Sequence, residues 1–209
     1  MNFRSKNLLV TGGYGFIGSN FIKQIFDKFS NVRIYNLDCL TYASDLSNIP
    51  DYISSHKNYN FIKGNICDYN LVNDIFGTNK IDGVINFAAE SHVDNSISNP
   101  DIFIKTNING TFNLLKIAYS HWMVNPFEIK KDYINARFHQ ISTDEVYGSI
   151  SEGSFKETDS YFPNSPYSAS KASADMLVRS FHKTYGLNVS TSICSNNYGS
   201  NQNKEKFIP

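Results

Sequence analysis

The sequence has no net charge, few cysteines and no long hydrophobic run, and each shortage excludes a class of protein. Lysine plus arginine and aspartate plus glutamate both total 19, so the chain lacks the basic blocks that bind nucleic acid or acidic lipid. Its apolar runs, such as Val84 to Ala89, are far shorter than the about 20 residues that a membrane-spanning helix needs. We therefore expect a soluble protein with no nucleic-acid partner and no membrane span.

The cysteines Cys39, Cys67 and Cys194 are odd in number and lack the spacing of metal ligands. The N-terminus lacks the charged-then-apolar pattern of a signal peptide. These features predict reduced thiols in the cytoplasm and no metal site.

Short apolar segments rich in strand formers alternate with segments whose apolar residues recur at helical spacing. At 209 residues the chain can bury one sizeable core, so a single domain is the default. Parallel strands joined by crossover helices are the expected outcome, which predicts an α/β fold with a doubly wound parallel sheet and helices on both faces. The predicted strands are Asn7 to Thr11, Val32 to Leu37, Asn60 to Lys63, Gly83 to Phe87, Arg137 to Ser142 and Val189 to Ile193, and the predicted helices are Phe16 to Phe29, Tyr69 to Phe76, Pro100 to about His121 and Pro166 or Tyr167 to about Tyr185.

Three polar connections are long for a compact fold: Thr41 to Asn58, Asn125 to Asn135 and Ser149 to Asn164. Connections of this length are often functional lids or insertions. For the middle one, which is rich in lysine and acid, we favour simple surface decoration.

A glycine-rich turn follows the first predicted strand and precedes the first predicted helix. Gly12, Gly13, Gly15 and Gly18 satisfy both the G-x-G-x-x-G and the G-x-x-G-x-x-G spacings. Glycine permits a tight turn and close approach of backbone N–H groups to a pyrophosphate, and the helix N-terminus adds about half a positive charge. The turn predicts a dinucleotide site, with an ordinary turn as the weaker alternative.

Asp38 ends the second predicted strand, 20 residues beyond Gly18, where a carboxylate can accept hydrogen bonds from the adenosine ribose. The residues that follow, Cys39, Leu40 and Thr41, offer no arginine for a 2′-phosphate. NAD is therefore favoured over NADP as the cofactor.

Tyr167 and Lys171 stand at i and i+4 of a predicted helix, hence on one face. A tyrosine base near neutral pH needs its pKa lowered from about 10 to near 7, about 4 kcal/mol, which a nearby lysine and the positive nicotinamide could supply. The pair alone also fits an ordinary solvated contact.

Thr143, Asp144 and Glu145 follow a predicted strand directly, at the strand ends where open α/β sheets bind ligands. Such residues also cap helices and turns, which is the competing interpretation. Their combination with Tyr167 and Lys171 favours a catalytic group.

The chain resembles the dTDP-glucose 4,6-dehydratase family and its UDP-glucose relatives, which are extended short-chain dehydrogenases with a Rossmann-type fold. The motifs Ser-Thr-Asp-Glu-Val-Tyr-Gly and Cys-Ser-Asn-Asn-Tyr-Gly are the most specific. The resembling stretches are TGGYGFIGSN (11–20), NLDCLTYASDL (36–46), FAAESHVDNSI (87–97), TNINGTFNLL (106–115), HQISTDEVYG (139–148), SPYSASKAS (165–173) and CSNNYG (194–199).

The resemblance implies oxidation of a nucleotide sugar at C4, elimination of water across C5 and C6, and return of the hydride to C6. Tyr167 would take the C4 hydroxyl proton, and Thr143 would orient or relay it. Glu145 would remove the C5 proton and Asp144 would protonate the leaving hydroxyl, since elimination needs a base and an acid.

The resemblance also assigns binding residues. Those for the cofactor are Gly12, Gly13, Gly15, Phe16, Ile17, Gly18, Asp38, Asn65, Ile66, Ala88, Ala89, Ser91, Thr106, Tyr167, Lys171 and Asn197, and those for the substrate are Ser91, Thr143 and Asn196. Paired asparagines at 196 and 197 equally fit a turn. Asn65 stands where the family usually has aspartate, and Ile193 where it usually has arginine.

Residues 1–209 are expected to form the NAD-binding domain that carries the catalytic residues, with the family's smaller substrate-binding domain largely absent. The predicted partners are dTDP-glucose or UDP-glucose and a second copy of the chain, joined through a four-helix bundle of the two long helices. One alternative is a truncated NAD-binding or dimerising remnant without turnover. Another is an epimerase or decarboxylase of the same fold, whose chemistry does not need the pair Asp144 and Glu145.

Overall fold

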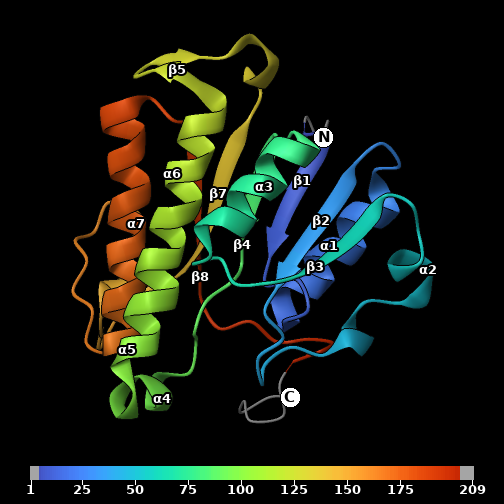
Figure 1. Ribbon diagram of the computed structural model, residues 1–209. Coiled ribbons are helices and arrows are strands. Elements are labelled where there is room, and N and C mark those ends of the chain that lie inside the picture. Colours follow the sequence, from blue (N-terminus) through green and yellow to red (C-terminus); the bar gives the residue numbers. More distant parts are fainter. Residues whose placement is uncertain (1–4, 203–209) are drawn as a thin grey trace.

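A six-stranded sheet forms the centre of the protein in a computed structural model that describes residues 5–202 (Figure 1). The strand order is β3-β2-β1-β4-β7-β8, and all neighbours run parallel. Its strands are β1 (Asn7–Thr11), β2 (Arg33–Asp38), β3 (Tyr59–Lys63), β4 (Gly83–Asn86), β7 (Arg137–Thr143) and β8 (Val189–Cys194). The predicted α/β fold with a doubly wound sheet is confirmed, and the predicted strand ends agree to within one residue.

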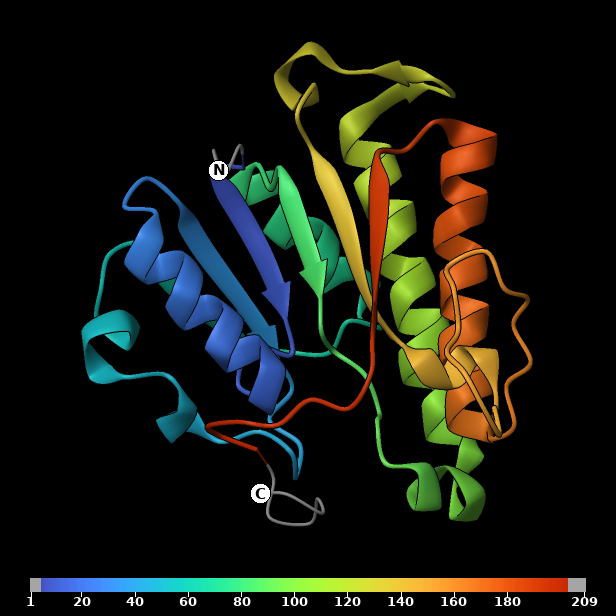
Figure 2. The ribbon, with the colours of Figure 1, turned by 180° about the vertical axis from the view of Figure 1, so that it is seen from behind.

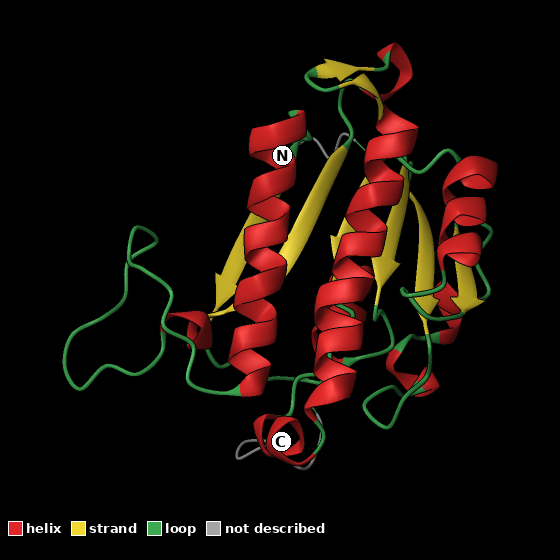
Figure 3. Ribbon diagram, turned by 60° about the vertical axis from the view of Figure 1, so that its left-hand side comes forward, coloured by secondary structure: helices red, strands yellow, loops and turns green. Residues whose placement is uncertain are grey.

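Helices cover both faces of this sheet. The α-helices of the described residues are α1 (Phe16–Lys28), α2 (Asp51–Ser54), α3 (Tyr69–Asn79), α4 (Val93–Ser98), α5 (Pro100–Phe103), α6 (Thr111–Trp122) and α7 (Pro166–Tyr185). Helix α1 lies on one face (Figure 2), and α6 and α7 stand side by side on the other (Figure 3). Within residues 5–202, no helix is long and apolar enough to cross a lipid bilayer.

The pleat of β1 divides the apolar residues between two cores. Leu9 packs in the cluster that includes residues of α3, α6 and α7, whereas Leu8 and Val10 pack in the cluster that includes residues of α1. Successive side chains of a strand point to opposite faces, so an unbroken apolar run is what a strand buried on both faces requires.

The predicted helix from Pro100 to His121 is interrupted. Residues Ile104–Gly110 (η2) form a π-helical turn between α5 and α6, which the spacing of apolar residues did not indicate. Within this turn Asn107 is buried and bonds both the backbone N–H and the carbonyl of Glu90, as well as Ser170 Oγ. These contacts come from distant parts of the chain, and they stabilise a rare kind of turn that is frequently found at functional sites.

The segment predicted as surface decoration forms a small hairpin of β5 (Met123–Asn125) and β6 (Glu128–Ile129), followed by a 3₁₀ turn η3 (Lys131–Tyr133). The N–H of Phe127 donates to the Tyr185 carbonyl at 2.8 Å, which joins this hairpin to the end of α7. The hairpin lies beyond the amino ends of the strands (Figure 1). It is therefore remote from the edge where ligands bind.

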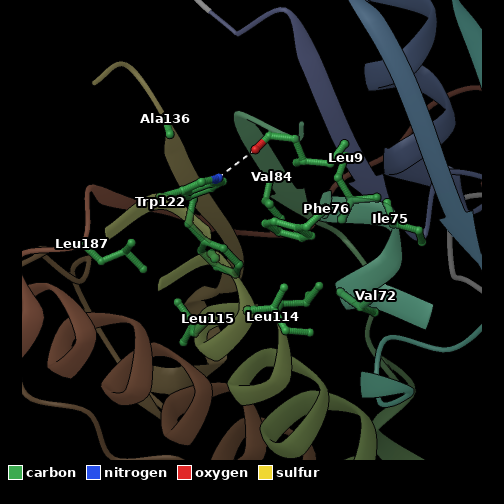
Figure 4. Packing of buried hydrophobic residues seen from close by; sticks show 14 of the residues in the cluster. Leu9, Val72, Ile75, Phe76, Val84, Leu114, Leu115, Trp122, Ala136 and Leu187 are labelled. Atoms are coloured by element: carbon green, nitrogen blue, oxygen red, sulfur yellow. Dashed lines mark hydrogen bonds between the residues drawn. The ribbon is translucent and has the colours of Figure 1, made fainter. Parts of the chain in front are cut away.

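Trp122 anchors α6 in the larger core (Figure 4). Its Nε1 donates to the Ile81 carbonyl at 2.7 Å, and both residues are buried. Trp122→Phe should lower the free energy of unfolding by about 2 kcal/mol, because a buried carbonyl loses its donor and the smaller ring leaves a cavity.

Urea unfolding followed by circular dichroism measures this loss, since Trp122 is the only tryptophan and its fluorescence disappears with the substitution. Val124→Ala, at an exposed position two residues further on, should change stability by less than about 0.5 kcal/mol. Equal stability of the Trp122→Phe variant and the parent chain would show that this bond is unimportant.

Candidate active site

The carboxyl ends of the parallel strands open onto one cavity of about 650 Å³. Its walls come from the turn after β1, the ends of β2, β4, β7 and β8, the π-helical turn and the start of α7. Open α/β sheets bind ligands at this edge, and the volume falls within the usual range for ligand pockets.

Most of the residues predicted for the site meet in this cavity. Those that line it are Gly12, Gly15, Phe16, Ile17, Gly18, Asp38, Asn65, Ile66, Ala88, Ala89, Ser91, Thr106, Thr143, Glu145, Tyr167, Lys171, Asn196 and Asn197. Residues separated by up to 185 positions, from Gly12 to Asn197, are thus brought together by the strand order.

Gly13 and Asp144 are not among the residues that line the cavity. Gly13 packs against β2: its N–H donates to Asn36 Oδ1 at 3.1 Å, and a Cβ there would lie 2.2 Å from the same oxygen. Asp144 opens the 3₁₀ turn η4 (Asp144–Tyr147), where Thr143 Oγ1 donates to its Oδ1 at 3.4 Å. Gly13 therefore shapes the turn, and Asp144 adjoins the cavity through Thr143.

The glycine turn leaves room for a diphosphate. Gly12 has φ +69°, and a Cβ there would lie 2.8 Å from the Ala88 nitrogen. At Gly15 an added Cβ would meet only the Gly12 carbonyl oxygen, at 3.3 Å. Helix α1 begins directly after Gly15 with no side-chain cap and no acid in its first turn, so its positive end faces the cavity. These features fit the diphosphate of a dinucleotide.

Asp38 is nearly fully buried and joins the end of β2 to the glycine turn. Its Oδ2 accepts from the Tyr14 N–H at 2.9 Å, and its Oδ1 accepts from the Leu40 N–H at 2.8 Å and from Ser44 Oγ at 2.9 Å. A carboxylate has about four acceptor positions, so Oδ2 keeps capacity for a ribose hydroxyl. The acid predicted from the sequence thus also orders the loop after β2.

Tyr167 is buried beside Thr143 and Glu145. Burial raises its pKa to about 12, and the negative charge of Glu145 acts in the same direction, against the hydrogen bond with Thr143. The expected contribution of Lys171 is not found, because its ammonium donates instead to the Ile141 carbonyl at 2.5 Å. The surrounding residues therefore do not lower the pKa of Tyr167 as a tyrosine base requires. The positive charge of the nicotinamide remains the predicted source of this lowering.

A second layer of polar residues supports the cavity, and sequence reasoning missed it. Ser142 and Tyr161 both donate to Asp175, which lies one helical turn beyond Lys171. The repeated four-residue interval from Tyr167 through Lys171 to Asp175 is the one signal that could have indicated this residue. Nothing local in the sequence indicated Ser142 or Tyr161.

The segment after β8 also belongs to the cavity, although only its asparagines were predicted. Tyr198 and Gln202 line the wall. The segment then runs beneath the strand ends toward α1 (Figure 2), where Asn20 Nδ2 donates to the Ser200 carbonyl at 2.8 Å and Asn201 Nδ2 to Ser19 Oγ at 3.2 Å. Ser200 and Asn201 are therefore held by the helix that begins at the glycine turn.

Comparison with known proteins agrees with this geometry. The family model described as GDP-mannose 4,6 dehydratase matches residues 9–209. The chain belongs to this family. Within it, the chain is 49% identical to the dTDP-glucose 4,6-dehydratase of Xanthomonas campestris pv. campestris (strain B100), over 96% of this chain and 56% of the relative. It is 48% identical to the enzyme of that name from Haemophilus influenzae, over 97% and 59% of the two chains.

Solved structures of similar proteins share this fold. The dTDP-glucose 4,6-dehydratase from Streptomyces venezuelae, solved with NAD bound, aligns with a TM-score of 0.85 at 42% identity and covers 97% of this chain and 60% of its own. The UDP-glucose 4-epimerase from Thermotoga maritima aligns with a TM-score of 0.81 at 27% identity, over 97% and 60% of the two chains. The chain thus spans somewhat more than half the length of these relatives, and its resemblance to the dehydratases is confirmed.

Proposed function

We propose that this chain is the NAD-binding and catalytic part of a nucleotide-sugar 4,6-dehydratase that acts on dTDP-glucose or UDP-glucose. The observation that carries the proposal is that Thr143, Glu145 and Tyr167 line the same cavity as the glycine turn, with Asp144 adjoining through Thr143. Relatives at almost half identity bear the dehydratase name, and two dehydratase structures at 42% identity were solved with NAD.

Each protein group in the cavity has a task in this chemistry. NAD, when bound, accepts a hydride and later returns it. Tyr167 takes the proton of the sugar C4 hydroxyl, and Thr143, which lines the same cavity, orients or relays this proton. Glu145, which faces the cavity, removes the C5 proton, and Asp144 protonates the leaving C6 hydroxyl. Two carboxylates in different environments can divide these roles.

Mass spectrometry of the chain incubated with NAD and either nucleotide-glucose tests the proposal. We expect a product that has lost one water. A folded, NAD-loaded chain that yields no such product from either nucleotide contradicts the proposal. An epimerase would leave the mass unchanged, and calorimetry that showed binding of NAD without the nucleotide sugar would indicate an NAD-binding protein without turnover.

We further propose that two copies associate through the long helices on the α6 and α7 face. Large apolar side chains lie exposed there: Ile104 is 44%, Phe112 45% and Met176 50% exposed. A four-helix bundle would cover such residues. Sedimentation equilibrium should give the mass of a dimer, and a monomer at micromolar concentration would contradict this assembly.

A further inference from the structure

A buried carboxylate, Asp175, lies below the catalytic groups. It follows Tyr167 and Lys171 at successive four-residue intervals of α7 and therefore shares their face of the helix. Its side chain is only 5% exposed. Burying a charge is costly unless it is paired, so this position requires an explanation.

The hydrogen bonds that Asp175 accepts come from two other elements. Its Oδ2 accepts a short hydrogen bond from Ser142 Oγ, and Tyr161 Oη donates to the same oxygen at 3.4 Å. Ser142 immediately precedes Thr143 on β7, and Tyr161 belongs to the 149–164 loop. One carboxylate thus joins the catalytic helix, the end of the catalytic strand and the loop that follows it.

Lys171 needs a negative charge near it. The ammonium is buried and donates to the neutral Ile141 carbonyl. Burial lowers the pKa of Lys171, and the charges of Asp175 and Cys194 oppose that change. Asp175 Oδ1 is buried and has no hydrogen-bond partner among residues 5–202, although buried polar atoms are normally paired. Packing alone does not explain a buried carboxylate with an unpaired oxygen.

We propose that Asp175 is a positioning residue: its carboxylate holds the end of β7 that carries Thr143 against α7 and supplies the negative charge that buried Lys171 requires. The cofactor cavity is thereby ordered before any ligand binds. The link to the cofactor rests on the proposed function and on the prediction that Lys171, which lines the cavity, binds NAD.

Titration of Lys171 by carbon-13 NMR tests the proposal without NAD. Asp175→Asn keeps the shape but removes the charge, so Lys171 should lose its proton at lower pH than in the parent chain. Asp175→Glu should restore most of the difference. Glu152→Gln, which removes an exposed carboxylate from the 149–164 loop, should leave the titration unchanged. The groups that face Lys171 are Asp175 on its own helix and Cys194 on β8.

If the Asp175→Asn variant does not fold, titration of Lys171 in a Ser142→Ala variant tests the proposal instead. Burial raises the pKa of Asp175, and Ser142, Lys171 and Tyr161 all act to lower it. Without the serine hydroxyl, Asp175 should take up its proton at higher pH, and the Lys171 signal should report this event. An Asp175→Asn or Ser142→Ala variant in which Lys171 titrates as in the parent chain overturns the proposal.

Calorimetry then links the charge to the cofactor. Asp175→Asn should weaken NAD binding about tenfold, whereas Glu152→Gln should bind normally. Unchanged NAD affinity in a folded Asp175→Asn variant also overturns the proposal. Failure of the parent chain to bind NAD would contradict the proposed function instead, and the NMR titration would still decide the role of Asp175.

Discussion

Alanine in place of Gly12 should weaken NAD binding by at least about 100-fold while the sheet stays folded. The residue has φ +69°, a region that costs a non-glycine residue about 1–3 kcal/mol when the surrounding structure enforces it. The added Cβ would also lie 2.8 Å from the nitrogen and 2.9 Å from the Cα of Ala88. Both contacts are with backbone, so the glycine turn or the end of β4 must move.

Calorimetric titration with NAD measures this effect, and Gly153→Ala provides the matched control. Gly153 also has positive φ, +88°, but a Cβ there would meet only the tip of Ile150, at 4.0 Å. The control therefore has the backbone strain without the collision and should bind NAD normally. Equal NAD affinity of the Gly12→Ala variant and the parent chain would refute the assignment of this turn to the cofactor.

Removing the Tyr167 hydroxyl should reduce dehydratase turnover by about 1000-fold, within the range for loss of a general base. Phenylalanine fills the same space, and the apolar contact with Phe103 persists, so the fold and NAD affinity should change little. The same substitution at the exposed Tyr198, which also lines the cavity, should retain most of the turnover. Turnover by the Tyr167→Phe variant at the parent rate would exclude this residue as the base.

The pH dependence should follow from the same residue. Burial raises the pKa of Tyr167 to about 12, so the neutral phenol predominates near pH 7 and the fraction of base grows as pH rises. The rate of the parent enzyme should therefore increase as pH rises through neutrality. This rising limb of the pH–rate profile should disappear in Tyr167→Phe. A positive charge that bound NAD brings near the phenol would move the limb to lower pH.

The strands could be predicted because their apolar runs are long enough to be buried on both faces, as the division of Leu8, Leu9 and Val10 between two cores shows. The π-helical turn at Ile104–Gly110, which interrupts the predicted helix, could not be predicted. It depends on Asn107, whose partners Glu90 and Ser170 lie far from it in the sequence. Helical periodicity carries no information about such contacts.

The site divides in the same way. Gly12, Gly15 and Gly18 could be located from spacing, because a fixed interval between glycines is what a strand, turn and helix impose around a diphosphate. Gly13 and Asp144 have the right spacing but do not line the cavity: Gly13 packs against Asn36, and Asp144 adjoins the cavity through Thr143.

Asp175 shows a further limit of local patterns. Its four-residue interval from Lys171 could have indicated a shared helix face, but its partners Ser142 and Tyr161 enter from a strand and a loop. Only the three-dimensional arrangement makes it part of the site.

The contacts of residues 198–202 couple this segment energetically to the start of α1. Asn20 and Ser19 of α1 hold Ser200 and Asn201, while the first turn of the same helix faces the cavity. A ligand that immobilises the first turn of α1 also restrains residues 198–202. Because such coupling is reciprocal, a contact that restrains this segment increases the affinity of the protein for the ligand. Amide hydrogens of residues 198–202 should then exchange with solvent more slowly in the presence of dinucleotide.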